Sequence, residues 1–190
     1  MDIVRNQQKE KMHPHKFTLW VAIGSLIMMF AGLTSAFIVK SNQANWKPVT
    51  LPTVFWVSTA VMLLSSLTIQ LALRSFKDRE MNKYRLFIGL TVLFGAAFIV
   101  FQWMGFQQLW AQQITFKGSG GGQFLYVIFG LHILHVAGGL IALAVIFLKG
   151  YFGKTKNYSA VPVEVAATYW HFVDALWIYL LIFFLILGKN

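Results

Sequence analysis

The sequence contains no cysteine among its 190 residues. This absence excludes disulfide bonds, zinc–thiolate sites, iron–sulfur clusters and cysteine nucleophiles, and it leaves the compartment open. Charged residues are also scarce, at 12% of the chain, which is about half the share typical of a soluble domain. Only six residues are Asp or Glu. The composition is therefore not that of a soluble domain.

Hydrophobic residues make up 57% of the chain and occur in long blocks, which is typical of a protein that crosses the membrane several times. The formal net charge is +10. In a soluble protein this excess would suggest nucleic acid as a partner. Here the basic residues lie mostly between the apolar blocks, so we interpret them as determinants of orientation and as contacts for anionic lipid. We expect no nucleic-acid partner.

Five apolar runs are long enough to cross about 30 Å of hydrocarbon as helices. They cover residues 17–40, 52–73, 86–109, 123–149 and 165–187. Residues 1–16 are polar and charged, and we expect a cytoplasmic tail there rather than a signal peptide, because the following apolar run is too long. The sequence predicts an all-α membrane protein with one five-helix transmembrane domain over residues 17–190.

The distribution of Lys and Arg predicts the orientation of this domain. If the runs alternate in direction, twelve of the 16 Lys and Arg residues fall on one side of the membrane, in the tail and in the loops after the second and fourth runs. Positive charge is retained on the cytoplasmic side. We therefore expect the N-terminus in the cytoplasm and the C-terminus in the periplasm.

Few titratable residues lie within the spans. His132 and His135 are in the fourth run, about 14–18 Å from its outer end, and His171 and Asp174 are in the fifth, about 9–14 Å from its inner end. An aspartate at this depth costs about 2.5–3.5 kcal/mol, so we expect Asp174 to face protein and to have a partner. Consecutive helices usually pack together, so we expect His135 to contact the Asp174 face.

Neighbouring residues support close packing of the last two helices. Trp170, Asp174 and Trp177 form one stripe of the fifth helix, where indole N–H groups can donate to buried acceptors. His135 shares a face with Gly138 and other small residues, which let helix backbones approach in lipid. Glu164 precedes the fifth run, where a helix N-terminus favours a carboxylate.

Three interpretations of this polar cluster remain open from the residues alone. The first is a polar clasp that fixes the packing of two helices. The second is heme ligation by His135 and His171 on facing helices, as in a membrane b-type cytochrome. The third is a proton or substrate pathway. One carboxylate with three histidines is sparse for a pump, and no charged residue continues a relay in the first three helices.

The motifs of the last two helices resemble subunit III of the heme–copper oxidases, specifically of the cytochrome c oxidase type. Residues 169–177 (YWHFVDALW) and 130–136 (GLHILHV) carry the resemblance, which extends over about residues 17–187. The chain resembles the short, five-helix bacterial form of the family. It departs from the family at three positions that often hold glutamate, where this chain has Ser25, Thr53 and Gly105.

The resemblance implies a non-redox subunit of a respiratory terminal oxidase that reduces oxygen and translocates protons. It implies that this chain binds no heme, copper or other metal, that these groups reside in partner subunits, and that the chain holds structural phospholipid. The implied partners are subunit I, in direct contact, together with subunit II and the surrounding lipids, and a respiratory supercomplex is compatible with the resemblance. The implied location is the bacterial plasma membrane, as a multi-pass protein.

The resemblance also implies roles for particular residues. No residue is expected to be catalytic. The clasp would pair Asp174 with His135 or His171, and the expected polar cluster comprises His132, His135, Trp170, His171, Asp174, Trp177 and Glu164. Lipid headgroups would contact Arg74, Arg79, Lys83 and Arg85. The alternatives are subunit III of a quinol oxidase and, from another class, a b-type cytochrome with His135 and His171 as heme ligands.

Overall fold

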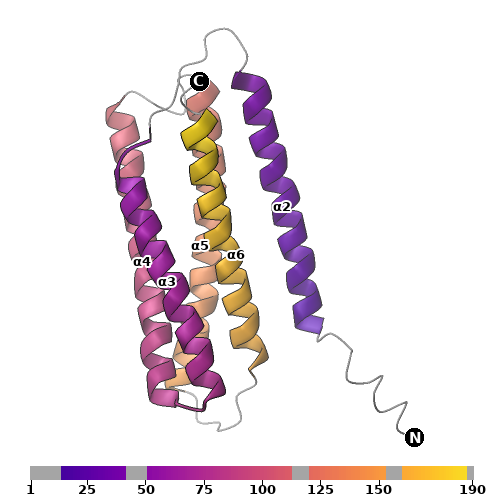
Figure 1. Cartoon of the computed structure of the whole chain (residues 1–190), viewed down its shortest axis with the longest axis vertical. Coiled ribbons are helices and arrows are strands. Elements are labelled where there is room, and N and C mark those ends of the chain that lie inside the picture. Colours follow the sequence, from indigo (N-terminus) through magenta and orange to yellow (C-terminus); the bar gives the residue numbers. More distant parts are fainter. Residues whose placement is uncertain (1–13, 42–50, 113–119, 153–159, 188–190) are drawn as a thin grey trace, which may run out of the picture.

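The computed structural model describes residues 14–41, 51–112, 120–152 and 160–187. These residues form five helices and no strand (Figure 1). Each helix is long and apolar enough to cross a membrane, which confirms the predicted all-α membrane fold. Residues 1–13 of the predicted tail lie outside the described residues. The helices are α2 (Pro14–Ser41), α3 (Val54–Lys77), α4 (Met81–Ala111), α5 (Gly120–Phe152) and α6 (Val161–Leu187).

The helices extend beyond the apolar runs at one end of the bundle. We call this the basic end; α2, α4 and α6 begin there, and α3 and α5 finish there. For example, α3 continues to Lys77 rather than stopping at residue 73, and α6 begins at Val161 rather than at residue 165. Long basic side chains reach water while the backbone remains helical, so the apolar run marks the hydrocarbon depth and not the end of the helix. At the opposite end, α3 begins at Val54, two residues after the start of its apolar run at residue 52.

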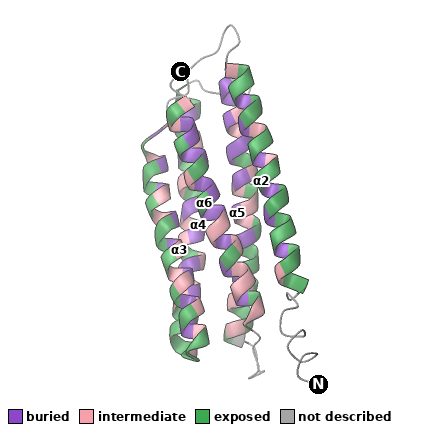
Figure 2. Cartoon of the chain, turned by 45° about the vertical axis from the view of Figure 1, so that its right-hand side comes forward, coloured by how far each residue is buried: buried purple, intermediate pink, exposed green. Residues whose placement is uncertain are grey.

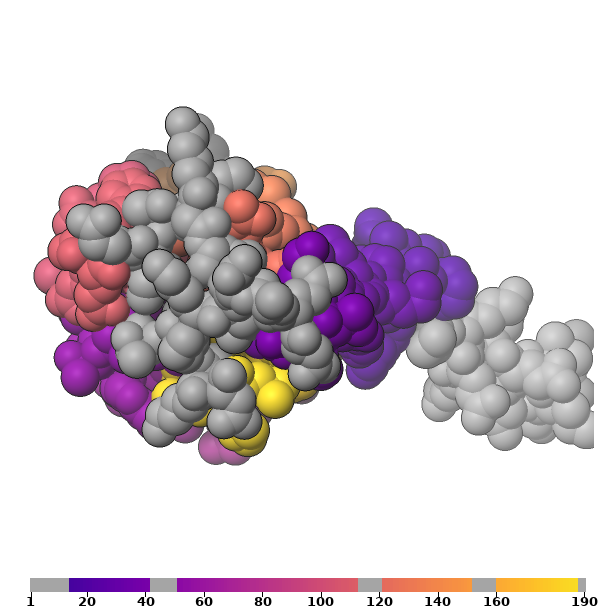
Figure 3. Space-filling view, turned by 90° about the horizontal axis from the view of Figure 1, so that it is seen from above, coloured from indigo at the N-terminus to yellow at the C-terminus, as the bar shows by residue number. Residues whose placement is uncertain are grey.

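The arrangement centres on α6. It packs against α2, α3 and α5, whereas α2 packs only against α5 and α6. The share of buried residues is 44% in the membrane-length window of α6 and 22–28% in those of the other helices. Figure 2 shows α2 exposed along most of its surface, and Figure 3 shows it projecting from the remaining helices. The predicted packing of the last two helices against each other is confirmed.

The core at mid-bundle consists of aromatic rings gathered around Trp177 of α6. The centroids of Phe55, Phe98 and Phe129 lie 6.0, 5.3 and 5.1 Å from that of Trp177. These three rings come from α3, α4 and α5, so one indole joins four helices. Edge-to-face and tilted contacts of this kind add to the packing energy that holds helices together in lipid.

Two glycines make room for the other buried indole of α6. A Cβ atom on Gly95 of α4 would lie 2.9 Å from both Leu140 Cδ1 and Trp170 Cη2. A Cβ atom on Gly139 of α5 would lie 2.9 Å from Tyr169 Cε1 and 3.2 Å from the Trp170 ring. The missing side chains therefore allow α4 and α5 to approach the large rings of α6.

This close approach makes alanine substitutions at two glycines differ in effect. Gly95→Ala forces a methyl group against Trp170, whereas Gly24→Ala on α2 places it where no atom lies within 4 Å. Both variants gain the same helix propensity, so the difference reports the clash. We expect Gly95→Ala to be less stable than Gly24→Ala by about 1–3 kcal/mol. Unfolding by titration with SDS from mild detergent measures this, and equal stabilities would contradict the packing described.

Candidate functional site

The two buried tryptophans of α6 donate hydrogen bonds to hydroxyl groups of α3. Trp170 Nε1 lies 3.0 Å from Ser65 Oγ, and Trp177 Nε1 lies 2.9 Å from Thr59 Oγ1. Both indoles are fully shielded from solvent. The Thr59 hydroxyl donates in turn to the Phe55 carbonyl at 2.7 Å. Both indole N–H groups thus donate to hydroxyl groups of α3, one on buried Ser65 and one on half-buried Thr59.

His171 forms the next polar contact between α6 and α3. Its Nδ1 lies 2.7 Å from Ser66 Oγ, and its Nε2 lies 3.2 Å from Gln70 Oε1. An amide oxygen can only accept, so Nε2 carries the proton of the imidazole and Nδ1 accepts from the Ser66 hydroxyl. Both ring nitrogens are therefore engaged within this chain. Heme ligation by His171 would require the release of one of these two bonds.

The expected pairing of Asp174 with a histidine is wrong. Asp174 is buried, and neither carboxylate oxygen has a hydrogen-bond partner among the described residues. His171 binds α3 instead. The Ser66 hydroxyl is a polar neighbour of the Asp174 carboxyl, but it lies outside hydrogen-bond geometry. The rotation of α6 that bonds both tryptophans to α3 also brings Asp174 near Ser66 of α3.

The histidines of α5 have different surroundings. His135 Nδ1 lies 2.6 Å from the Leu131 carbonyl of its own helix, and the His135 carbonyl accepts from the Tyr169 hydroxyl at 3.2 Å. His132 is fully buried and stacks on Trp177 at 5.3 Å, and neither of its nitrogens has a partner among the described residues. His132 therefore belongs to the aromatic core, and His135 bonds within α5.

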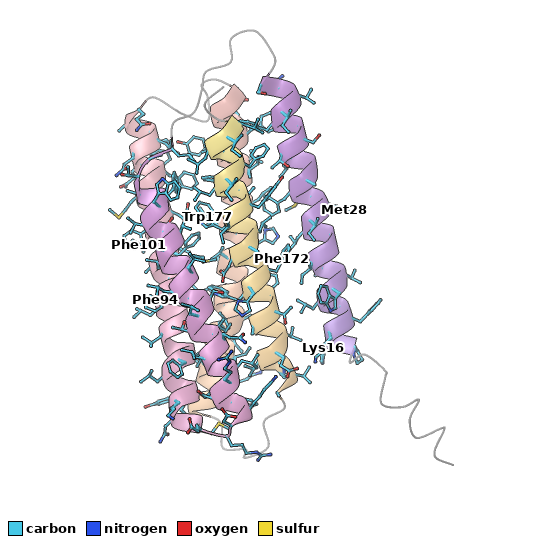
Figure 4. All side chains as sticks on the ribbon, in the orientation of Figure 1. Lys16, Met28, Phe94, Phe101, Phe172 and Trp177 are labelled. Carbon is cyan, nitrogen blue, oxygen red and sulfur yellow. The ribbon has the colours of Figure 1, made fainter. Side chains whose placement is uncertain are left out.

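Glu164 joins three helices at the basic end, a role that we did not predict. It lies in the first turn of α6, whereas we expected it just before that helix. Its carboxylate oxygens lie 2.8 Å from Lys16 Nζ of α2 and 3.3 Å from Lys77 Nζ of α3. Figure 4 places Lys16 at the foot of α2. The sequence contained the information for this contact. Because successive helices run in opposite directions, Lys16, Lys77 and Glu164 all fall at the same end of the bundle.

The four candidate headgroup contacts also lie at the basic end. Arg85 Nε donates to the Gly150 carbonyl at 2.9 Å, and Lys83 pairs with Glu80 at 2.8 Å. Arg74 and Arg79 are exposed. Binding of lipid headgroups at these four positions stays a prediction.

An open groove lies between α2, α5 and α6 near the basic end, with a volume of about 610 Å³. Small residues such as Ala22, Gly138 and Ala142 line it, together with Leu19 and Tyr169. A Cβ atom on Gly138 would meet no atom within 4 Å, so the absence of a side chain contributes directly to this space. The lining of the groove is therefore mostly apolar, and His15 lines it at the basic end.

These contacts favour the structural interpretation of the polar cluster. The side chains of Trp170, His171 and Trp177 are all bonded to α3. Among the described residues, no three His, Asp or Glu side chains come together as metal ligands would. The arrangement can hold α6 against α3 at a fixed rotation.

Comparisons with known proteins give a consistent result. A family model described as "Cytochrome c oxidase subunit III" matches residues 7–189. The chain is 29% identical over 166 residues to cytochrome c oxidase subunit 3 of Bacillus subtilis, covering 85% of this chain and 80% of that protein. It is 31% identical over 182 residues to the probable cytochrome c oxidase subunit 3 of Nocardia farcinica, covering 89% of each. The corresponding probable subunit of Mycobacterium leprae is 32% identical over 162 residues, or 83% of this chain and 80% of that protein.

Replacing Thr59 by valine tests the bond to Trp177. Valine keeps the shape of threonine but leaves the buried indole N–H without an acceptor, which costs about 1–3 kcal/mol. Thr18→Val is the control, because the exposed Thr18 hydroxyl bonds only to the Pro14 carbonyl of its own helix. We expect Thr59→Val to lower the free energy of unfolding in detergent by that amount and Thr18→Val to change it little. Equal effects would show that the bond is unimportant.

Proposed function

This chain belongs to the cytochrome c oxidase subunit III family, and on that premise we propose that it is a non-redox subunit that packs directly against subunit I. The resemblance inferred from the motifs of α5 and α6 is confirmed. The chain is a multi-pass protein of the bacterial plasma membrane and a subunit of a heme–copper oxidase. The open question is what it contributes to that complex.

The observation that supports a non-redox role is the use of the polar side chains of α6. Heme ligation needs an imidazole nitrogen with a free lone pair. The Nδ1 lone pair of His171 accepts from Ser66, and its protonated Nε2 donates to Gln70. His135 donates from Nδ1 to its own helix, which leaves the lone pair of its Nε2, so the engagement of His171 is what opposes ligation by this pair. We propose that these groups stabilise a rigid bundle, and that heme and copper are held by the partner subunits.

We further propose that the groove between α2, α5 and α6 holds a structural phospholipid. Its lining is apolar, as an acyl chain requires, and it opens near the basic end, where His15 lines it. Lys16 lies next to this lining on α2. Basic residues at a membrane surface attract anionic headgroups, so an anionic phospholipid fits both parts of the site. A lipid held here would fill the space between α2 and the other helices, and would thereby help to sustain proton uptake and turnover in subunit I.

Purification of the tagged chain from its host membrane in mild detergent tests the proposed role. We expect heme–copper oxidase subunits to co-purify, identified by mass spectrometry and by the visible spectrum of the complex. The chain separated from those subunits should show no visible absorbance. A Soret band on the separated chain would support the b-type cytochrome instead, and the absence of oxidase subunits would contradict the proposal.

Filling the groove tests the lipid site. Gly138→Leu places a side chain in the groove, and Gly130→Leu places the same side chain elsewhere on α5; a Cβ atom meets nothing within 4 Å at either position. We expect the oxidase with Gly138→Leu to lose bound phospholipid and the oxidase with Gly130→Leu to keep it, as measured by native mass spectrometry. Equal lipid content in the two variants would place the lipid elsewhere.

A further inference from the structure

One ion pair joins two walls of the groove between α2, α5 and α6. Lys16 Nζ of α2 lies 2.8 Å from a carboxylate oxygen of Glu164 on α6. Each of the two residues is next to the lining of its own wall, because Lys16 follows His15 on α2 and Glu164 precedes Val165 on α6. In Figure 1, α2 diverges from α6 toward the basic end. The pair therefore bridges α2 and α6 at the end of the groove where these helices separate.

The bridge lies at the depth of lipid headgroups. Lys16 directly precedes the apolar run that begins at residue 17, and Glu164 directly precedes the run that begins at residue 165. The end of an apolar run marks the boundary between the hydrocarbon and the headgroup region. A phospholipid whose acyl chain fills the groove therefore brings its phosphate to the level of Lys16 and Glu164.

The charge near the groove comes from the bridge and one further lysine. Among the described residues, those that line the groove include no Lys, Arg, Asp or Glu. Lys77 Nζ of α3 lies 3.3 Å from the second carboxylate oxygen of Glu164. Two ammonium groups and one carboxylate together carry a net charge of +1. Glu164 thus cancels half of the positive charge that would attract an anionic headgroup.

A lipid phosphate and the Glu164 carboxylate are alternative partners for Lys16. The Lys16 side chain is 44% and the Glu164 side chain 25% exposed, and an ion pair with this exposure contributes little to stability. A phosphate can therefore displace the carboxylate from Lys16, while Lys77 keeps Glu164 paired. The carboxylate also repels the headgroup, and this repulsion is stronger for a headgroup with a net negative charge than for a zwitterionic one.

We propose that Glu164 sets the headgroup preference of the groove. It competes with the lipid phosphate for Lys16, and it thereby limits the preference of the groove for anionic over zwitterionic phospholipid. This inference rests on the proposed lipid site, and it names the residue that determines which phospholipids the site accepts.

Lipid exchange into the whole oxidase tests the role of Glu164. The oxidase with the wild-type chain or with Glu164→Gln is equilibrated in mild detergent with equal amounts of phosphatidylglycerol, which is anionic, and phosphatidylethanolamine, which is zwitterionic. Native mass spectrometry counts both lipids, and the groove lipid is the part that is lost when Gly138→Leu is added to the same chain. We expect Glu164→Gln to raise the ratio of phosphatidylglycerol to phosphatidylethanolamine in the groove about fivefold. An unchanged or lower ratio would overturn the proposal.

Two further variants separate the charge of Glu164 from its effect on the packing of α2. Lys16→Gln breaks the same ion pair but removes the partner of the phosphate, so we expect the ratio to fall about fivefold. Glu80→Gln is the matched control, because Glu80 pairs with Lys83 at 2.8 Å at the same end of the bundle, at the start of α4 and outside the groove lining. We expect the wild-type ratio for this control.

The outcomes distinguish the proposal from the function on which it rests. If Glu164→Gln and Lys16→Gln change the ratio in the same direction, loosening of α2 is the cause and the proposal is wrong. A change as large in Glu80→Gln would also overturn it, because the effect would then belong to the whole basic end. If Gly138→Leu removes no lipid from the wild-type oxidase, the proposed lipid site fails rather than only its selectivity.

Discussion

The structure depends on the hydrogen bonds that three side chains of α6 make to α3 within the hydrocarbon. Each indole N–H of Trp170 and Trp177 finds a hydroxyl acceptor on α3, and His171 finds both a donor and an acceptor there. A rotation of α6 by one residue about its axis would break all of these bonds together. The stripe of polar groups therefore sets the rotation of α6, and with it the packing of the other helices against this central one.

With α6 in this rotation, aromatic rings and glycines of the neighbouring helices pack closely around its two buried indoles. Trp177 meets rings from three other helices, while Gly95 and Gly139 leave space for Trp170. Helix α2 does not share in this core to the same extent, because it contacts only α5 and α6. Its basic end is tied to α6 by the Lys16–Glu164 ion pair next to an open groove. The bundle thus combines four helices that share an aromatic core with a fifth helix, α2, that packs against only two of them.

The sequence predicted the helices and the polar stripe of α6, but not the partners of that stripe. Apolar length identifies spans, and helical periodicity places Trp170, Asp174 and Trp177 on one face. Which helix this face contacts depends on the rotation of α6 among α2, α3 and α5. The order of helices along the chain suggests α5, because consecutive helices usually pack together, whereas the hydrogen bonds go to α3. The prediction therefore pairs Asp174 with a histidine to which it makes no hydrogen bond. The bridge through Glu164 was missed for a related reason, since it joins charges that are far apart in the chain. The family followed from motifs that are local and needed no such geometry.

The central claim is that hydroxyl groups of α3 hold the indoles of α6. A double-mutant cycle with Trp170→Phe and Ser65→Ala tests it most directly, because the coupling free energy isolates their hydrogen bond from the loss of ring volume. The measured quantity is the free energy of unfolding of the four proteins in detergent. We predict a favourable coupling of about 0.5–1.5 kcal/mol. Strictly additive effects of the two substitutions would contradict the account.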